Sequence, residues 1–358
     1  MKRRLLYTSV GVLTLVFGVV LAKLIALTRS APELEAAQVG AGFEVASFGD
    51  YKISGPYAHG NLSIFLIHGA DNLRGFSPLT LEEAVGRGAV VVRETGEVNE
   101  LAIENISAEE VFAQAGDIVK GGKQDRTLSV DLILPPHSGE MPLSVFCVEQ
   151  GRWTPRDGKP AMAEAFSMRE MIASKDLKMA VKGAASQAAV WAGVSRAQAR
   201  LSESVGAEVR SAESASSLQL TLENEKVRES AEDYARALAN IIGGRDDVIG
   251  YAFAINGELN SADVYASHAL FRELWMKLLR ASAVEAVAES AAGATGASTG
   301  AETVRAFLAD AEAGAPSPER DVAGRIKILT RESERGVLIE ARDLERGGAW
   351  LHRNYLSK

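Results

Sequence analysis

Short apolar runs separated by Gly, Pro, Asn and Asp follow one another from Phe43 to about Gly151. This spacing is typical of antiparallel strands in two packed sheets, so it predicts a β-sandwich or jelly-roll-like half. One short helix should interrupt the strands, because Thr80 and Glu83 form a capping box at the start of residues 81–86. The first half of the chain is therefore predicted to be rich in β structure.

The pattern becomes helical after Arg156. Ala, Met, Glu and Lys dominate Ala161–Leu201, where apolar residues recur at spacings of three and four. The Ser/Ala/Glu-rich stretch Ser202–Ser217 is expected to be a flexible or weakly helical connection. Residues 218–242 are then predicted to form one helix that stops at Gly243, where a positive φ is favoured.

A β-hairpin is the clearest local signal of the second half. Val248–Ile255 and Glu258–Tyr265 alternate apolar residues on either side of Asn256-Gly257, the favoured two-residue turn. One face of the first strand carries only small residues, so a closely packed helix is expected there. The helix that Ser267 caps is its predicted partner. With apparent strands near 325–330, 337–341 and 350–355, this half is predicted to be α+β with a mostly antiparallel sheet.

The N-terminus carries the signature of membrane entry. Lys2–Arg4 precede Leu5–Ala22, a run of 18 uncharged and mostly apolar residues. This run is longer than the ~7–15 residues usual for a cleaved signal and is long enough to span a bilayer, which favours an anchor. Val20 and Ala22 also form a small-residue cleavage site, so a secreted or periplasmic protein is the alternative.

The basic residues before the apolar run orient the N-terminus inside the cell. We therefore expect a single-pass protein of the cytoplasmic membrane, held through Leu5–Ala22, whose C-terminal body lies outside the cytoplasm. The predicted order along the chain is a membrane or signal segment (1–27), a spacer (28–42), a β-rich domain (43–155), a helical connector (156–217) and an α+β domain (218–358).

Composition excludes several classes of function. The chain has 358 residues, of which 47% are hydrophobic, enough for two domains with cores. A net charge of -8 and the lack of a basic patch argue against nucleic-acid binding. Cys147 is the single cysteine, so no internal disulfide is expected. The five His residues have no metal-ligand spacing, and neither a phosphate loop nor a nucleophile elbow is present, so no metal or cofactor is predicted.

Two segments concentrate polar residues inside predicted β structure, at 121–126 and 147–153. Lys, Gln, Glu and Arg are poor residues for a strand core, so their clustering needs a reason. If the strands on either side of 135–142 pair antiparallel, Arg126 lies opposite about Gln150. Both polar segments then lie at the same end of the sheet.

These segments supply the candidate site residues. Glu149 could act as a general base and Cys147 as a nucleophile. The alternative is a structural network in which an Arg–Glu pair and a Gln satisfy buried backbone groups. Cys147 shares a strand face with Leu143 and Val145, which favours a buried, unreactive thiol. The predicted ligand-binding residues are Lys123, Gln124, Arg126, Glu149, Arg152 and Trp153.

The same segments resemble the ARG and Rhodanese-Phosphatase-superfamily-associated protein domain family. Asp125 departs from the family pattern, which favours Asn, so a ligand contact of that side chain would differ. The resemblance implies no assigned reaction, although the family name points to a nucleotide or phosphoester context. It covers about Pro78 to Lys358 and is carried by Leu79–Ala84, Glu104-Asn105, Gly116-Asp117, Gly121–Arg126, Cys147–Trp153, Gln187–Trp191, the Asn256–Gly257 hairpin and His352.

Two functions fit these observations. The first, which we prefer, is a membrane-anchored binding or accessory module outside the cytoplasm that holds a protein or small-molecule partner near Gln124, Arg126, Glu149 and Arg152. The second is a hydrolase or transferase acting on a phosphate- or ADP-ribose-like substrate. In that case Glu149 would be the base, and Arg126 and Arg152 would bind the anion. An extracytoplasmic location is harder to reconcile with intracellular ADP-ribose chemistry, which favours the first.

Overall fold

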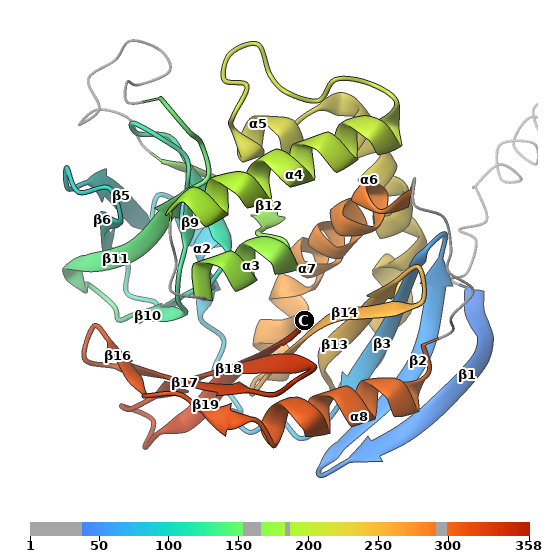
Figure 1. Ribbon diagram of the computed structural model, residues 1–358. Coiled ribbons are helices and arrows are strands. Elements are labelled where there is room, and N and C mark those ends of the chain that lie inside the picture. Colours follow the sequence, from blue (N-terminus) through green and yellow to red (C-terminus); the bar gives the residue numbers. More distant parts are fainter. Residues whose placement is uncertain (1–37, 153–165, 183–186, 291–298) are drawn as a thin grey trace, which may run out of the picture. The chain divides into compact units, whose positions relative to one another are not determined.

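The computed structural model describes residues 38–152, 166–182, 187–290 and 299–358 (Figure 1). These residues form an α+β fold built on three β-sheets, most of whose strand pairs are antiparallel. The expected membrane segment at 1–27 lies outside them. Within the described residues, no helix combines the length and the apolar character needed to cross a bilayer.

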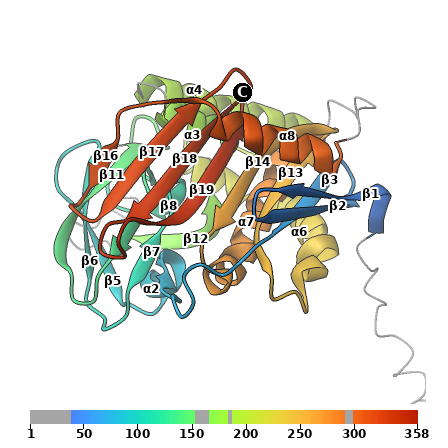
Figure 2. The ribbon, with the colours of Figure 1, turned by 90° about the horizontal axis from the view of Figure 1, so that it is seen from below.

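The largest sheet brings together strands from both ends of the chain. It has ten strands, and all its neighbouring pairs are antiparallel (Figure 2). The first three strands, residues 38–68, pair with the Asn256–Gly257 hairpin, which in turn pairs with the last strand. The order is β1 (Gln38–Phe48), β2 (Tyr51–His59), β3 (Leu62–His68), β13 (Val248–Ile255), β14 (Glu258–Tyr265), β19 (Ala349–Ser357), β18 (Gly336–Asp343), β17 (Ile326–Glu332) and β15 (Ala315–Pro316), with β16 (Arg320–Val322) also beside β17.

Two smaller sheets enclose a second core between residues 79 and 172. Val92, Leu128, Val145 and Leu134 are among the buried residues that meet between them. This packing matches the two-sheet pattern expected from the sequence, although it starts at Leu79, because the strands before residue 69 join the large sheet. The six-stranded sheet runs β12 (Ser167–Ile172), β8 (Asp117–Lys120), β9 (Arg126–Leu128), β11 (Gly139–Cys147), β6 (Glu100–Asn105), β5 (Val90–Glu94); the other runs β10 (Leu132–Leu134), β7 (Val111–Ala113), β4 (Leu79–Thr80).

Helices cover both faces of the large sheet (Figure 1). The predicted partner of the small-residue face of β13 is wrong. Helix α7 (His268–Ala288) packs Trp275 and Leu278 against the aromatic face, which carries Tyr251 and Phe253. The small-residue face is covered by α8 (Ala301–Glu312), together with Phe65 and Tyr355 of the sheet. The bulky side chains of α7 fill the space around the aromatic rings, which explains the choice of face.

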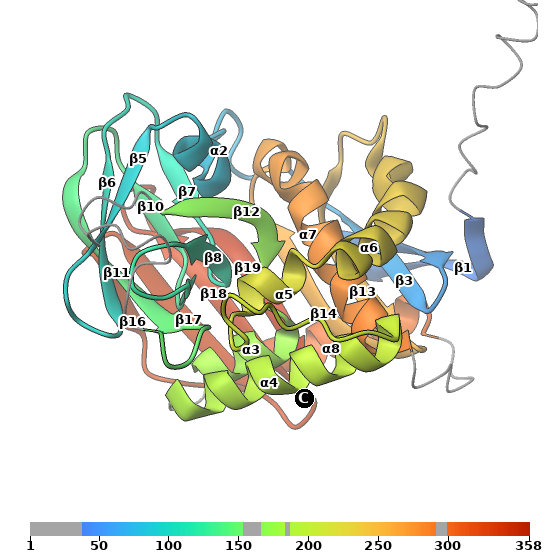
Figure 3. The same cartoon turned by 90° about the horizontal axis from the view of Figure 1, so that it is seen from above.

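The remaining helices pack around α7. The predicted helix at 218–242 is divided into α5 (Leu218–Leu222), α6 (Glu225–Leu238) and the 3-10 turn η2 (Ala239–Ile242), because Asn224 leaves the helix and caps α6 by accepting from the Lys226 amide. Figure 3 shows α4 (Gln187–Val205) and α3 (Lys175–Lys182) beside them. Their apolar residues meet the side of α7 that carries Val284.

The short-range predictions are confirmed. Thr80 accepts from the Glu83 amide and the Glu83 carboxylate accepts from Thr80, which completes the capping box of α2 (Leu81–Gly86). Asn256 and Gly257 have φ values of 52° and 83°, the positive region that this hairpin turn requires. Ser267 accepts from the Leu270 amide and caps α7. These helix caps and this turn depend on residues that are neighbours in the chain, so they can be predicted from the sequence.

The small sheets attach to the rest of the molecule through buried contacts. Phe112 and Ile133 share a core with Ile328 and Leu351 of the C-terminal strands. On another side, the Lys277 ammonium of α7 lies 2.6 Å from the Asp117 carboxylate of β8, and both side chains are buried. The junction between the small sheets and the C-terminal strands is where the cavity described below is found.

Candidate functional site

The two predicted polar segments do come together. Strands β9 and β11 pair antiparallel, as expected, and place Cys147 opposite Arg126. The predicted partner of Arg126 was Gln150, three residues away, because residues 132–134 turn aside to pair with β7 instead of continuing the hairpin. We call Gln124, Asp125, Glu149 and Arg152, which lie beyond the ends of these two strands, the polar cluster.

Hydrogen bonds surround Glu149 at the centre of the polar cluster, although the buried side-chain oxygen of Gln124 has no partner among the described residues. The Arg152 guanidinium donates to both carboxylate oxygens of Glu149, over 2.8 and 2.7 Å. The Asp125 amide donates to Glu149 Oε2 over 3.0 Å, and the Gln124 side chain donates to the Glu149 carbonyl over 2.9 Å. Asp125 in turn accepts from the Ser217 hydroxyl, which also caps α5. The cluster thus ties the end of the β9–β11 pair to a helix of the other half.

The electrostatics of Glu149 follow from these bonds. Burial would raise the pKa of its carboxyl, but hydrogen bonds from Arg152, Ser214 and the Asp125 amide lower it to about 2. A carboxylate with so low a pKa is a weak proton acceptor. Glu149 is therefore permanently charged and firmly paired.

Arg126 and Cys147 lie deeper, and both are fully buried. The Arg126 guanidinium makes no hydrogen bond, and its Nη2 is 3.8 Å from a carboxylate oxygen of Glu94. Glu94 accepts from the Lys123 amide over 2.7 Å. Burial raises the pKa of the Cys147 thiol, with Arg126 opposing in part, which keeps it protonated and poorly nucleophilic. Trp153 lies outside the described residues.

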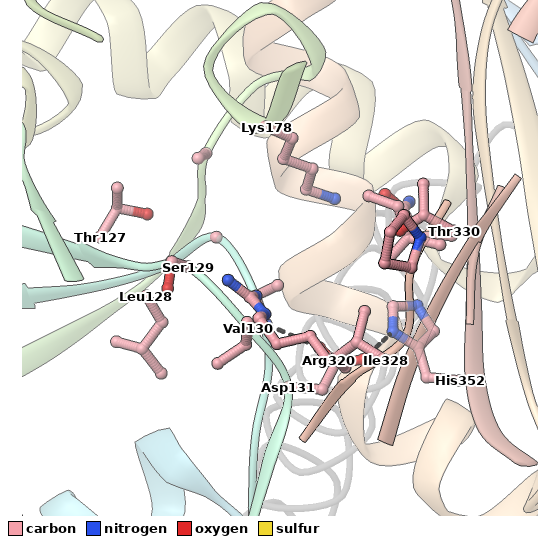
Figure 4. A pocket seen from close by; sticks show the side chains of 16 residues that line it. Thr127, Leu128, Ser129, Val130, Asp131, Lys178, Arg320, Ile328, Thr330 and His352 are labelled. Atoms are coloured by element: carbon pink, nitrogen blue, oxygen red, sulfur yellow. Dashed lines mark hydrogen bonds and ion pairs between the residues drawn. The ribbon is translucent and has the colours of Figure 1, made fainter. Parts of the chain in front are cut away.

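A cavity of about 200 Å³ lies elsewhere, between the small sheets and the C-terminal strands. Its walls combine residues 127–131 of the small sheets with Lys178 of α3, Arg320 of β16 and Thr330 of β17 (Figure 4). His352 of β19 completes the lining. We call this space the His352 cavity.

Two carboxylates hold the His352 ring. Its Nδ1 is 2.8 Å from an oxygen of Asp131 and its Nε2 is 2.9 Å from an oxygen of Asp263. Burial would lower the pKa of the imidazole, but the two aspartates raise it to about 9. The ring is therefore an imidazolium at neutral pH, stacked on Tyr265 with centroids 4.5 Å apart. Because both nitrogens are engaged, His352 cannot accept a proton from a ligand in this arrangement.

Neighbouring groups fix the two aspartates. The second oxygen of Asp131 accepts from the Ala115 amide over 2.8 Å, and Asp263 accepts from the Asn354 side chain over 2.7 Å. The Lys178 ammonium lies 3.9 Å from Asp263. Burial would raise the pKa of Asp263, but Lys178 and His352 together lower it. The charged pairs below the cavity are thus positioned by strands from both halves.

Two other groups on the cavity wall have no such partners. The Thr127 hydroxyl is buried and makes no hydrogen bond, although its residue lines the cavity. The Arg320 side chain also lines the cavity and makes no ion pair with any residue that the structure describes. Partial burial lowers the pKa of its guanidinium. Thr127 has no accessible surface, whereas the Arg320 side chain is exposed, so Arg320 is the one of these two groups that a ligand in the cavity can reach.

The family model of the ARG and Rhodanese-Phosphatase-superfamily-associated Protein domain matches residues 50–356. The chain belongs to this family. The match confirms the resemblance and extends it toward the N-terminus, since it begins at residue 50 and not near Pro78. The structure explains the earlier start, because β2 and β3 pair within the large sheet of the domain. Neither a curated protein nor a solved structure matches the chain.

Both the polar cluster and the His352 cavity lie within this ARG and Rhodanese-Phosphatase-superfamily-associated domain. Sequence patterns pointed to the first and missed the second, because Asp131 and His352 are 221 positions apart. A signal was present in Asp263, His352 and Asn354, polar residues within otherwise apolar strands. In the part of the chain that the structure describes, no group of three or more His, Cys, Asp or Glu side chains is arranged to hold a metal ion.

Proposed function

We propose that the chain is an extracytoplasmic binding module that holds a small molecule in the His352 cavity. The observation that carries this proposal is a cavity of about 200 Å³ whose wall brings together Lys178, Arg320 and the His352 imidazolium. Charged and polar groups that converge on one accessible volume are typical of a ligand site. The cavity lies where two packed units meet, a common location for ligand sites.

The volume limits the size of the ligand. A protein cavity of roughly 150 Å³ holds one benzene molecule. By this standard the His352 cavity accommodates about six to ten non-hydrogen atoms. A nucleotide or an ADP-ribose-like substrate is several times larger and would extend from the open side of the cavity into solvent. A small metabolite would fit within the cavity.

The chemistry of the candidate catalytic groups also favours binding over turnover. Both oxygens of Glu149 accept hydrogen bonds and its pKa is about 2, so it is a poor base. Cys147 is a buried thiol with a raised pKa. The two nitrogens of His352 are engaged by carboxylates. A hydrolase or transferase would need one of these groups to be released first.

For the polar cluster we propose a structural role. Its bonds join the β9–β11 end to the Ser217 cap of α5, and they satisfy a carbonyl, an amide and a carboxylate that are all buried. Arg152 then acts by neutralising Glu149. On this proposal the ligand-binding role expected for Gln124 and Arg152 passes to charged residues of the cavity wall such as Arg320.

The extracytoplasmic location rests on the N-terminal pattern of Lys2–Arg4 followed by Leu5–Ala22. Alkaline phosphatase, which is active only outside the cytoplasm, can be fused after Lys358 of the full chain. We expect an active fusion in the membrane fraction. Activity in the soluble periplasmic fraction would indicate cleavage after the apolar run, and an inactive fusion would contradict the proposed location.

Occupation of the cavity can be tested without knowing the ligand's charge. Thr330→Trp places a large side chain on the cavity wall, whereas Thr303→Trp places it on the exposed side of α8. Melting of the full-length chain is followed with a mixed set of small acids, amides, amines and sugars. We expect at least one compound to raise the Tm of the wild type and of Thr303→Trp but not of Thr330→Trp. No difference between the two variants for any compound would contradict the proposal.

A further inference from the structure

We infer that a second pocket, beside Glu285, binds a small organic cation that carries N–H donors, such as a primary amine or a guanidine. This inference is independent of the His352 cavity and goes beyond the proposed function. It is carried by a pocket of about 360 Å³, by the excess of carboxylates on its wall, and by a mostly buried carboxyl group that makes no ion pair with any described residue. We call this space the Glu285 pocket.

The Glu285 pocket lies where three helices meet the Asn256–Gly257 hairpin. Its wall combines the C-terminal part of α7, which carries Glu285, with the start of α3, one side of α4 and the first residues of β14. None of the residues that line it belongs to the His352 cavity. Since a cavity of roughly 150 Å³ holds one benzene molecule, this pocket accommodates about 12 to 16 non-hydrogen atoms.

Acidic side chains outnumber basic ones on the wall of the Glu285 pocket. The four acidic and two basic residues are Asp176, Glu258, Glu285, Glu289, Lys175 and Arg200. Arg200 pairs with Glu289 and lies 3.9 Å from Asp176. The Lys175 ammonium donates to the Ser357 hydroxyl over 3.0 Å and pairs with none of these carboxylates. Glu258 and Glu285 therefore have no ion pair with any residue that the structure describes.

Glu285 is the acidic group best placed to be the counter-ion of a ligand. Its two oxygens accept from neutral donors, the Lys175 amide over 3.2 Å and the Asn260 side chain over 3.1 Å. Burial raises the pKa of this carboxyl to about 7, although these hydrogen bonds and the charges of Lys178 and Lys175 oppose the rise. A bound cation with N–H groups would supply both an opposite charge and hydrogen bonds, and so would favour the ionised form.

The wall also limits the kind of cation. Apolar side chains that are partly exposed, Ala197, Leu259 and Ala288, lie among the charged groups, which suits a carbon chain better than a bare ion. Quaternary ammonium groups are typically held by aromatic faces, and no aromatic residue is among the described residues that line this pocket. A cation that can donate hydrogen bonds to carboxylates fits the wall better.

The test measures binding to the full-length chain by titration calorimetry. The probes are butylamine, 1,4-diaminobutane and agmatine, with 1-butanol as the neutral counterpart of butylamine. Tetramethylammonium serves as a cation without N–H donors, and magnesium chloride as a metal ion. We expect at least one amine or guanidine to bind, and butanol, tetramethylammonium and magnesium to bind at least about tenfold more weakly.

Binding should also release a proton. At pH ~6.5 the Glu285 carboxyl is mostly protonated, so an incoming cation should displace its proton to the buffer; at pH ~8.5 the group is already ionised and no release is expected. The dependence of the binding enthalpy on the ionisation enthalpy of the buffer measures this release. The other titratable groups around Glu285 are Lys175, Asp176 and Lys178 of α3, Arg200 of α4, Tyr251 of β13, Glu258 of β14 and Glu289 of α7.

A change at Glu285 separates charge from shape. Glu285→Gln should weaken binding of the best cation by about tenfold or more at pH ~8.5 and should abolish proton release at pH ~6.5. The new side chain can still accept from the Lys175 amide, and the Asn260 oxygen, which has no partner among the described residues, can turn to accept from its NH₂ group. Glu273→Gln is the matched control, because Glu273 is exposed on the same helix and does not line the pocket; it should change neither quantity.

A change at Ala197 fills the pocket. Ala197→Trp should abolish binding of the cation, whereas Ala199→Trp, at an exposed position of the same helix outside the pocket, should preserve it. Thr330→Trp, which fills the His352 cavity, should also preserve it. Circular dichroism should show that all variants are folded.

Several results would overturn the inference. Equal binding of butylamine and butanol would remove the role of charge, and an unchanged affinity in Glu285→Gln would remove the role of this carboxylate. Binding of magnesium but of no amine would replace the organic cation by a metal ion. Loss of amine binding in Thr330→Trp but not in Ala197→Trp would assign the cation to the His352 cavity. Absence of binding by every amine and guanidine would refute the inference and leave the proposed function of the His352 cavity untouched.

Discussion

The polar cluster and the His352 cavity both hold buried charges at the border of the small sheets, yet they differ in what their donors and acceptors do. In the polar cluster, both oxygens of Glu149 accept hydrogen bonds, and Asp125 is bonded to Ser217. In the His352 cavity, the Lys178 and Arg320 side chains line open volume, and Arg320 makes no ion pair with any described residue. Groups that are paired with one another indicate a structural joint, and charged groups beside a cavity indicate a binding site.

Arg126 shows that neither burial nor an unpaired donor is sufficient alone. Its guanidinium is fully buried and makes no hydrogen bond, but it does not line the His352 cavity. Its surroundings are side chains such as Glu94, 3.8 Å away, and the buried thiol of Cys147. A ligand site needs polar groups and accessible volume in the same place.

The largest effect is expected from breaking the polar cluster. Glu149→Gln removes the charge that neutralises Arg152, and loss of one partner of a buried ion pair costs about 3–5 kcal/mol. Urea denaturation should show a fall of this size in the free energy of unfolding. Glu97→Gln, at an exposed position of a turn, should change it by less than about 0.5 kcal/mol. A small change in the free energy of unfolding of Glu149→Gln would contradict the structural role proposed for the polar cluster.

A smaller effect is expected from raising the pH across the titration of His352. Its pKa rises from 6.5 to about 9 on folding, so its stabilising contribution is complete below 6.5 and is lost as the pH passes 9. The pKa of the Glu285 carboxyl rises from 4.5 to about 7 on folding, so its stabilising contribution is lost as the pH rises from 4.5 to 7. Denaturation between pH ~7.5 and ~9.5 should therefore isolate a loss of about 2 kcal/mol from His352.

The control for this pH dependence is His137→Asn, which changes an exposed histidine in a turn and should keep the same profile. His352→Gln should remove the decline in the free energy of unfolding between pH ~7.5 and ~9.5, whatever its effect on overall stability. A wild-type profile that is flat over this range would mean that His352 is not held as an imidazolium by Asp131 and Asp263.

The smallest expected effect is a gain in stability. Thr127→Val replaces an unsatisfied buried hydroxyl with a methyl group, so it should raise the free energy of unfolding of the ligand-free chain by about 1 kcal/mol. Thr221→Val removes an equally buried hydroxyl that donates to the Ser217 carbonyl and accepts from Gln198, and it should lower that free energy by about 1 kcal/mol. Equal losses in both variants would show that the Thr127 hydroxyl is satisfied.

The local structure could be predicted because its causes lie in adjacent residues. The Asn256-Gly257 turn requires positive φ at both positions, and Thr80 and Glu83 satisfy each other's amides, so neither needs information from elsewhere. The meeting of the two polar segments followed from the antiparallel pairing of β9 and β11. The register of this pairing could not be predicted, because the course of residues 129–134 depends on the partner strand β7.

The packing of the halves could not be predicted in the same way. Small residues on β13 suggested room for α7, but the choice of face was decided by Trp275 meeting Tyr251 and Phe253. The cavity was missed because its walls come from four separate parts of the chain. Polar residues inside the apolar strands β14 and β19 were the available sign, and only the fold shows that Asp263 and His352 face the same space.

Asp125 allows a mild change to be made in the polar cluster. Asn, the residue that the resemblance led us to expect at this position, keeps the size of the side chain and one acceptor oxygen. Asp125→Asn should therefore weaken the polar cluster without unfolding the chain, because the remaining oxygen can still accept from the Gly121 amide and the new side-chain amide can donate to the Ser217 hydroxyl. It provides a milder change than Glu149→Gln.

The most direct test compares melting curves of the full-length wild type, Asp125→Asn and Thr330→Trp with and without the compound of the mixed set that raises the Tm of the wild type most. We predict that Asp125→Asn has a lower Tm but keeps the ligand-induced rise, and that Thr330→Trp melts close to the wild type but loses this rise. The opposite pattern, with the rise lost in Asp125→Asn and kept in Thr330→Trp, would place the ligand at the polar cluster and contradict the account.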